Sequence, residues 1–137
     1  MRFSKLLILS FVFVCLFLTP TVRGQKNVFK AVVDSDGIQR VTVTGGDYFF
    51  NPDYIIVKVN TPVELIVKKE PGIVPHNIVI KEPGAGIDIN ETLSTEPKTI
   101  KFVPKKNGKY PFYCDKKLLF FKSHRERGME GVIEVTD

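Results

Sequence analysis

The sequence predicts an all-β protein, an antiparallel Greek-key β-sandwich made of a single domain. Short runs of β-branched and aromatic residues alternate with Gly, Pro, Asn and Asp along most of the chain. About eight such runs in roughly 110 residues are typical of a sandwich. No long segment repeats its hydrophobic residues with a helical period, and a chain of this length can form one core but not two.

The expected strands follow one another with short turns between them. Residues 28–33 and 38–43 flank the turn at 34–37, which ends in glycine, and this pattern predicts a hairpin. Residues 54–59 and 63–67 flank a second turn in the same way. The remaining strands are predicted at 76–80, 99–103, 109–113 and 132–135.

Two segments depart from this pattern. Residues 82–98 are rich in Gly and Pro and are expected to be an irregular linker that crosses from one sheet to the other. Residues 115–128 begin with Asp115, a good helix N-cap, and end with Gly128, which predicts a short helix or an irregular insertion. This segment contains four consecutive large apolar residues, Leu118, Leu119, Phe120 and Phe121.

The first 24 residues have the pattern of a secretory signal peptide. Arg2 and Lys5 precede an apolar run at 6–18, and a small-residue exit follows at 22–24. We expect cleavage after Gly24, a mature domain at 25–137, and a periplasmic or secreted protein without a stable membrane span. An uncleaved anchor is the alternative, although the apolar run is short for one.

The charge balance argues against a nucleic-acid partner. Three of the 20 basic residues leave with the leader, which keeps 17 basic residues against 15 acidic ones, a net charge of +2. No cluster of lysine and arginine is interleaved with aromatic residues, as a nucleic-acid surface would require.

The mature chain retains one cysteine, two histidines and one methionine, namely Cys114, His76, His124 and Met129. Cys114 has no partner for an internal disulfide, so it is a free thiol, an intermolecular bridge or a metal ligand. Each of the four residues alone has an ordinary explanation in the core or on the surface. Together, a thiolate, two imidazoles and a thioether are the donors of a mononuclear electron-transfer copper site. A helix starting after Cys114 would also favour its thiolate.

Four motifs carry a resemblance to a known family. Phe50-Asn51-Pro52 leads into a strand, His76-Asn77 follows a Pro-rich bend, Gly108-Lys109-Tyr110-Pro111-Phe112-Tyr113-Cys114 forms a strand that ends in cysteine, and His124 precedes Gly128-Met129-Glu130-Gly131. Over its mature length the chain resembles the cupredoxins, single-domain copper proteins of the plastocyanin and azurin type.

The resemblance implies a copper site with His76, Cys114 and His124 as strong ligands and Met129 as a weak axial ligand. It also implies that Asn77 ties the two ligand loops together by hydrogen bonds. One departure is the nine residues between Cys114 and His124, where the family usually has only a few.

The long ligand loop leaves the geometry of the copper site open. A further ligand could be water or a carboxylate, such as that of Asp115 or Glu126. A binuclear centre, as in the second subunit of cytochrome oxidase, fits poorly because that loop carries two cysteines and this one has only Cys114.

We expect the protein to be a single-electron carrier and not an enzyme, because no acid–base pair or catalytic triad can be assembled. A redox partner protein is expected to dock near His124 and residues 118–121, unless that run completes the core. A copper-delivery module for the maturation of another enzyme is the alternative function, and a metal-free structural sandwich is the third.

Overall fold

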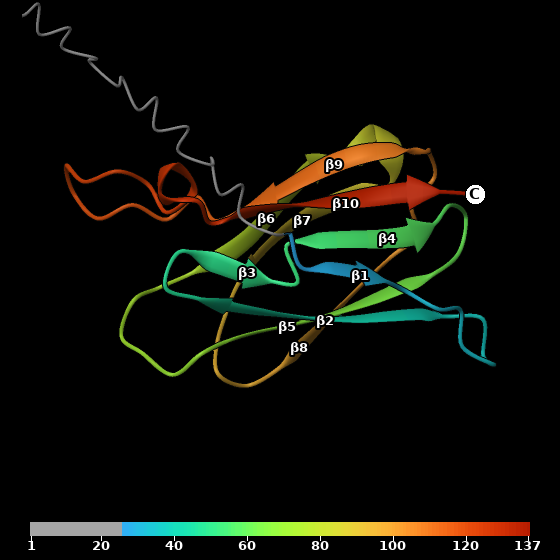
Figure 1. Ribbon diagram of the computed structural model, residues 1–137, viewed down its shortest axis with the longest axis horizontal. Helices are drawn as coiled ribbons and strands as arrows, with labels where there is room; N and C mark the ends of the chain where they lie inside the picture. The colour runs from blue at the N-terminus through green and yellow to red at the C-terminus, as the bar shows by residue number, and fades with distance from the viewer. Residues whose placement is uncertain (1–25) are drawn as a thin grey trace, which may run out of the picture.

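The computed structural model describes residues 26–137, so the predicted signal peptide at 1–24 lies outside the described residues. The described part contains ten strands and two 3-10 turns (Figure 1). The strands are β1 (Val28–Lys30), β2 (Gln39–Gly46), β3 (Phe49–Asn51), β4 (Tyr54–Lys58), β5 (Val63–Lys69), β6 (Asn77–Glu82), β7 (Ile87–Thr92), β8 (Lys98–Phe102), β9 (Gly108–Tyr113) and β10 (Glu130–Thr136). No helix in this part of the chain is long and apolar enough to cross a membrane.

Two sheets pack face to face and confirm the predicted all-β sandwich (Figure 1). The six-stranded sheet has the order β1-β4-β10-β9-β6-β7, and the four-stranded sheet has the order β3-β2-β5-β8. Both sheets are mixed where the sequence predicted antiparallel ones: β4 runs parallel to β1 and β10, and β2 runs parallel to β5. The reason is that β1 and β2, like β4 and β5, are consecutive in the chain but belong to opposite sheets.

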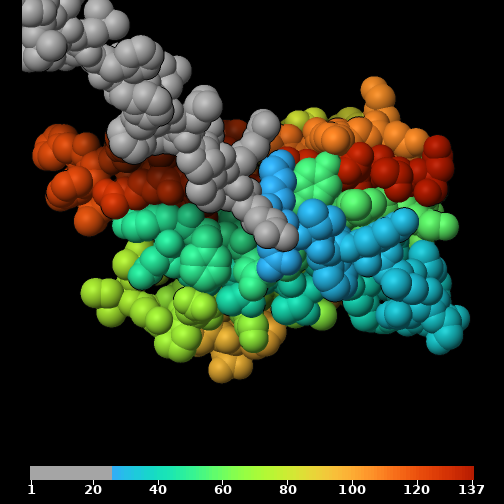
Figure 2. Space-filling model, in the orientation of Figure 1, coloured from blue at the N-terminus to red at the C-terminus, as the bar shows by residue number. Residues whose placement is uncertain are grey.

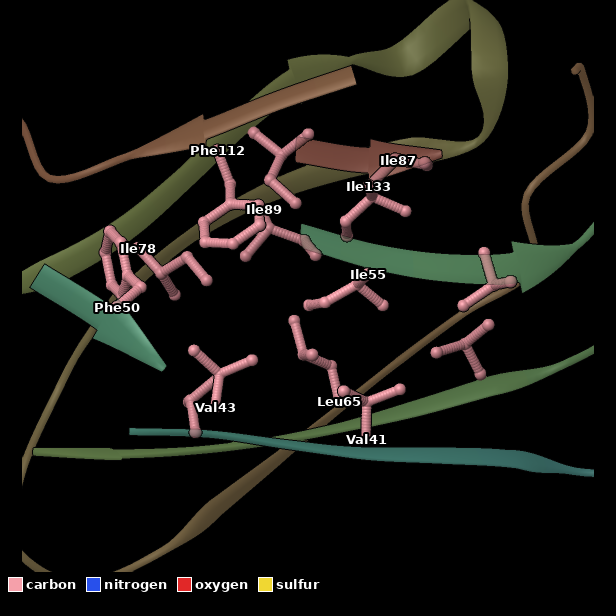
Figure 3. Packing of buried hydrophobic residues seen from close by; sticks show 14 of the residues in the cluster. Val41, Val43, Phe50, Ile55, Leu65, Ile78, Ile87, Ile89, Phe112 and Ile133 are labelled. Atoms are coloured by element: carbon pink, nitrogen blue, oxygen red, sulfur yellow. The ribbon is translucent and has the colours of Figure 1, made fainter. Parts of the chain in front are cut away.

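The predicted hairpin of residues 28–33 and 38–43 is therefore wrong. Only an isolated bridge between Val33 and Gln39 joins these two runs. Alternate residues of β2 are buried, which places Val41 and Val43 in the core opposite Ile55 of β4 (Figure 3). The β2 strand thus fills the centre of the small sheet, whereas β1 is exposed along its length at an edge of the large one.

The linker predicted at 82–98 is only partly irregular. It begins with a 3-10 turn at Pro83–Ala85 and continues as strand β7, which pairs with β6 in the same sheet. Only the residues after β7 cross to β8 in the other sheet. The alternation of buried Ile87 and Ile89 with exposed polar residues is the strand signal that the neighbouring Gly and Pro masked.

The segment at 115–128 is the irregular insertion that was predicted as one of two possibilities. No helix follows Cys114, and the only regular element in this segment is a 3-10 turn at Arg125–Arg127. The carboxylate of Asp115 accepts a hydrogen bond from the Asn77 side chain and does not cap a helix.

The core lies between the sheets and reaches the end where β9 ends and β6 begins. Phe50 and Phe112 meet there edge to face, with ring centroids 5.2 Å apart (Figure 3). Cys114 and Met129 belong to this same buried cluster. Rigid, closely packed surroundings therefore hold two of the four predicted donor residues in place.

Candidate metal centre

Three loops meet at one end of the sandwich (Figure 1). They are the turn between β2 and β3, which carries Tyr48, the bend between β5 and β6, which carries His76, and the loop between β9 and β10, which carries Cys114 and His124. This end is where the chain places all four predicted donor residues.

Three donor side chains converge on one point inside these loops. The Nδ1 atoms of His76 and His124 lie 3.1 Å apart, and the Cys114 Sγ lies 3.4 Å from the same nitrogen of His124. One donor atom from each residue lies within 4.8 Å of the other two. All three residues are buried, with 3% of His76, none of Cys114 and 5% of His124 exposed.

This arrangement fits a single metal ion. Two imidazole nitrogens that each lie about 2 Å from one ion are separated by about 3 Å, which is the spacing between the two histidines here. A thiolate with two imidazoles selects copper in a trigonal site, whereas sites for magnesium or calcium use oxygen donors. The residues present therefore fit the expected copper cofactor.

Met129 lies beside this cluster and is completely buried. Its backbone N–H donates to the carbonyl oxygen of His124 across 3.0 Å, and its own carbonyl accepts from the N–H of Cys114 across 3.1 Å. Its terminal methyl group packs against Gly45 so closely that a Cβ at position 45 would lie 3.2 Å from it. The backbone of Met129 is thus tied to two of the predicted ligands.

Asn77 connects the two segments that carry the donors. Its side-chain amide donates to Asp115 across 2.8 Å, and its carbonyl oxygen accepts from the backbone N–H of Asp115 across 3.1 Å. The backbone N–H of Asn77 points at the Cys114 sulfur, 3.4 Å away. Asn90 of β7 accepts a further hydrogen bond from the Asn77 amide. Asn77 therefore fixes the spacing between His76 and Cys114.

The long spacing between Cys114 and His124 is bridged by backbone hydrogen bonds. The N–H of His124 donates to the carbonyl oxygen of Lys116 across 2.9 Å, and the N–H of Arg125 donates to that of Cys114 across 3.1 Å. Residues 117–123, which we call the excursion, form a loop that projects from the site and is closed at its base by the hydrogen bond between Lys116 and His124. The segment that frames the site is consequently as short as the family pattern implies.

The two carboxylates considered as further ligands have other partners. Asp115 bonds to Asn77, as described above. Glu126 accepts hydrogen bonds from both the backbone N–H and the hydroxyl of Ser123, at 2.6 and 2.8 Å. Among the described residues, the donor cluster contains histidine and cysteine and no carboxylate.

Burial sets the protonation of the donors. It raises the pKa of the Cys114 thiol, and the N–H groups of Asn77 and Lys116 only partly oppose this shift. The prediction that a helix stabilises the Cys114 thiolate is wrong, because no helix begins after Cys114. Burial also lowers the pKa of both imidazoles. The charges of His124 and Lys69 lower the pKa of His76 further, and the charge of Arg127 lowers that of His124 further. The imidazoles are therefore neutral near pH 7, as metal ligation requires.

The ring of His124 borders an apolar pocket of about 310 Å³. Its walls include Tyr48, Ile73 and Leu118, and the Tyr48 ring meets His124 edge to face with centroids 5.0 Å apart. Tyr48 could not be identified from the sequence, because its contact depends on the approach of two loops distant in the chain.

The run of Leu118, Leu119, Phe120 and Phe121, which we call the apolar tip, does not complete the core. The four residues are between 58% and 98% exposed. Leu118 alone of the four lines the pocket beside His124. The interpretation of this run as ordinary core is therefore wrong.

Comparison with known proteins agrees with the architecture. The family model described as "Cupredoxin-like domain" matches residues 7–129. No curated protein sequence matches the chain.

Similar solved structures include the metal-binding domain of the Streptococcus pneumoniae D39 Cu(I)-exporting P-type ATPase CopA with Cu(I), at 22% identity and a TM-score of 0.62, covering 83% of this chain and 100% of that one. Dithionite-reduced auracyanin from Roseiflexus castenholzii is similar at 20% identity and a TM-score of 0.55, covering 72% and 97%. The periplasmic domain of subunit II of cytochrome oxidase (CoxB) of Bradyrhizobium japonicum is similar at 14% identity and a TM-score of 0.54, covering 72% and 83%. At these identities the likeness shows the fold alone.

Proposed function

The chain belongs to the cupredoxin-like domain family, and from this premise we propose that it is an exported copper protein that carries single electrons. His76, Cys114 and His124 would be the strong ligands and Met129 the weak axial ligand. Bound copper would supply a one-electron couple between Cu(I) and Cu(II). The observation that carries the proposal is the convergence of two imidazoles and one thiol in a buried site.

The surrounding residues suit electron transfer because they hold the ligands still. Asn77 and the backbone of Met129 tie the donor segments together, so the positions of the donors depend little on whether a metal is bound. The N–H of Asn77 directed at the Cys114 sulfur favours its thiolate form. Burial of all three donors keeps water away from the site. A site that does not rearrange lowers the cost of gaining or losing one electron.

Electrons would enter and leave through the ring of His124. This ring faces the apolar pocket lined by Tyr48, Ile73 and Leu118, whereas Cys114 is fully buried and His76 borders a different pocket. A redox partner protein would dock over this pocket and bring its own cofactor close to the imidazole. His124 would therefore be the ligand through which electrons pass between the copper and the partner.

Spectroscopy of the copper-loaded chain from Gln25 on tests the proposal. We expect an intense visible sulfur-to-copper charge-transfer band and reversible one-electron reduction. Cys114→Ala should remove the band while circular dichroism still reports a folded sandwich. Glu126→Gln is the matched control and should keep the band, because Ser123 holds that carboxylate away from the donors. A band that survives in Cys114→Ala would show that the ligand assignment is wrong.

Copper delivery to another protein is the second candidate function. It is favoured by the likeness to the Cu(I)-containing metal-binding domain of a copper exporter, which this chain covers completely. A carrier gives a coloured Cu(II) form and fast electron exchange. A delivery module would instead give a tight, colourless Cu(I) complex that passes its ion to an acceptor chelator faster than the free ion dissociates.

A further inference from the structure

The apolar tip is exposed at the end of a loop that the metal site does not need. Phe120 is 98% exposed and Leu119 is 74% exposed, and the tip turns over at a hydrogen bond from the Phe121 N–H to the Leu118 carbonyl. Figure 2 shows the orange segment that contains the tip standing clear of the sandwich. Ile73, in the bend between β5 and β6, is fully exposed and borders the same pocket as Leu118. Clustered exposed apolar groups of this size indicate an interaction surface.

Positive charges surround this tip. Lys116 and Lys117 precede it and Lys122 follows it, and none of the ion pairs among the described residues involves these three lysines. The one carboxylate in residues 116–127 belongs to Glu126, which accepts hydrogen bonds from Ser123, and its pKa is lowered by these bonds and in part by the nearby charges of Lys117 and Lys122. The three lysines nevertheless outnumber the carboxylates of Asp115 and Glu126, so this end of the molecule combines an exposed apolar tip with flanking residues of net positive charge.

We propose that this end of the sandwich binds the surface of an anionic lipid bilayer. The side chains of the apolar tip and Ile73 enter the boundary between headgroups and acyl chains. Lys117 and Lys122 keep their ammonium groups at the lipid phosphates while their aliphatic stems follow the apolar side chains inward. This binding does not depend on the proposed copper function.

The shape and composition of the surface favour lipid over a protein partner. Anchor residues of protein interfaces sit in packed surroundings, and lysine is depleted in such interfaces. Phe120 has almost no packed neighbours, and three lysines flank the tip. A fluid bilayer can surround a projecting point from every side, and its negative surface attracts these lysines.

The excursion also allows insertion without disturbing the metal centre. Residues 117–123 leave and return at the hydrogen bond between Lys116 and His124, so the tip can enter lipid while the donors stay in place. Insertion would turn the pocket beside His124 toward the membrane. A redox partner that docks over this pocket would then have to be held at the same membrane.

Vesicle binding tests the proposal on the chain from Gln25 on. Among residues 26–137, which the structure describes, the buried core residues lie between Ala31 and Val135, so this chain contains that core. It lacks the apolar run at 6–18, which would itself bind lipid. We expect it to sediment with vesicles of phosphatidylcholine and phosphatidylglycerol in equal amounts, and much less with phosphatidylcholine alone. Added salt should weaken the binding.

Matched variants separate the tip from the rest of the surface. Phe120→Ser with Phe121→Ser should weaken binding to the anionic vesicles at least about tenfold. Lys117→Gln with Lys122→Gln should weaken it about thirtyfold. The controls change like residues outside the metal-site loops, Lys105→Gln with Lys106→Gln and Val32→Ser, and should leave binding unchanged.

A fluorescent probe keeps the test decisive even if the double phenylalanine variant is unstable. The chain contains four tyrosines but no tryptophan, so Phe120→Trp introduces a single tryptophan, which can be excited selectively at wavelengths that tyrosine does not absorb. Its emission should shift to the blue with anionic vesicles, whereas that of Val32→Trp should not. If the chain does not sediment with anionic vesicles and the tryptophan emission does not shift to the blue, the proposal is overturned. An acidic protein would then be the expected partner of the apolar tip. Equal binding by the tip variants and the unchanged chain would overturn it as well.

Discussion

The backbone N–H of His124 donates a hydrogen bond to the carbonyl oxygen of Lys116 across 2.9 Å. This contact closes the excursion at its base. If the excursion is left out, only Asp115 and Lys116 lie between Cys114 and His124 in the segment that surrounds the site. The long spacing in the sequence therefore does not imply an altered metal geometry, because the additional residues project outward from the site.

Removal of the apolar tip should leave the copper site intact. Deletion of residues 118–121 joins Lys117 to Lys122 and still leaves three residues to span from Lys116 to His124. We expect the charge-transfer spectrum of the copper-loaded protein to be nearly unchanged, and the melting temperature to be preserved because exposed side chains contribute little to the core. Loss of the spectrum would show that the excursion itself shapes the site.

Asn77 should be the polar residue whose removal disturbs the site most. Its side chain makes two hydrogen bonds to Asp115, and Asn77→Ala leaves the Asp115 carboxylate and N–H without these partners. We expect a loss of about 1–3 kcal/mol in the free energy of unfolding and a broadened copper spectrum. Asn90→Ala is the matched control, because Asn90 is exposed and makes one hydrogen bond to Asn77. Chemical denaturation of both variants compares them, and equal losses would contradict the role of Asn77.

The sequence predicts the strands far better than their pairing. Alternating apolar residues identify β4, β5 and β9 because this pattern is local to each run. Which sheet a strand joins depends on packing between segments distant in the chain. The hairpin expected between residues 28–33 and 38–43 was therefore wrong, and the sheets are mixed. Strand β7 was missed because Pro83, Gly84 and Gly86 lie directly before it, and such residues usually mark a loop.

The sequence could suggest candidate donor residues because a copper site needs scarce residue types in a fixed order, and the structure brings His76, Cys114 and His124 together. The sequence did not identify Tyr48, Asn90 and Gly45 as residues of the site. Each belongs to a common residue type and contributes only through contacts that the fold creates. Asp115 was interpreted as a helix cap or a ligand, whereas the structure uses it to hold Asn77. Tertiary contacts determine which of several possible partners a polar side chain bonds to, and the pattern of a single sequence does not contain those contacts.

Gly45 should be essential for the close packing beside the metal site. A Cβ at this position would lie 2.8 Å from Leu93 Cδ1 and 3.2 Å from Met129 Cε. Gly45→Ala should therefore displace Met129, cost about 1–3 kcal/mol of stability and change the copper spectrum. Gly84→Ala is the matched control, because its Cβ would meet nothing within 4 Å. Thermal denaturation and visible spectra of the two variants check this, and an unaltered Gly45→Ala spectrum would mean that Met129 does not respond to position 45.

Replacement of Met129 by leucine should raise the reduction potential while copper stays bound. Leucine has a similar volume, so the fully buried position should lose less than about 1.5 kcal/mol of stability. Removing the weak axial donor favours Cu(I), which makes fewer demands on its ligands. Voltammetry of both proteins measures the shift. Loss of copper would show that Met129 is a strong ligand or a structural residue, and an unchanged potential would remove it from the site.

Copper loading near pH 7 should release one proton per ion, and that proton should come from Cys114. Burial raises the pKa of this thiol, so it is protonated before the metal arrives and must lose its proton to become a ligand. The pKa values of His76 and His124 are lowered, so both imidazoles are already neutral and release none. Below those lowered pKa values the imidazoles become protonated, further protons must be displaced, and affinity should fall more steeply as the pH decreases.

An indicator dye in weakly buffered solution counts the protons released as Cu(I) is added. Met129→Leu is the matched control, because a thioether carries no proton and the count should stay at one. A count near zero at pH 7 would mean that Cys114 is already a thiolate, so that the N–H groups of Asn77 and Lys116 outweigh burial. A count near two would mean that one of the two histidines is protonated in the metal-free protein. Either result would overturn the assignment of protonation states on which this prediction rests.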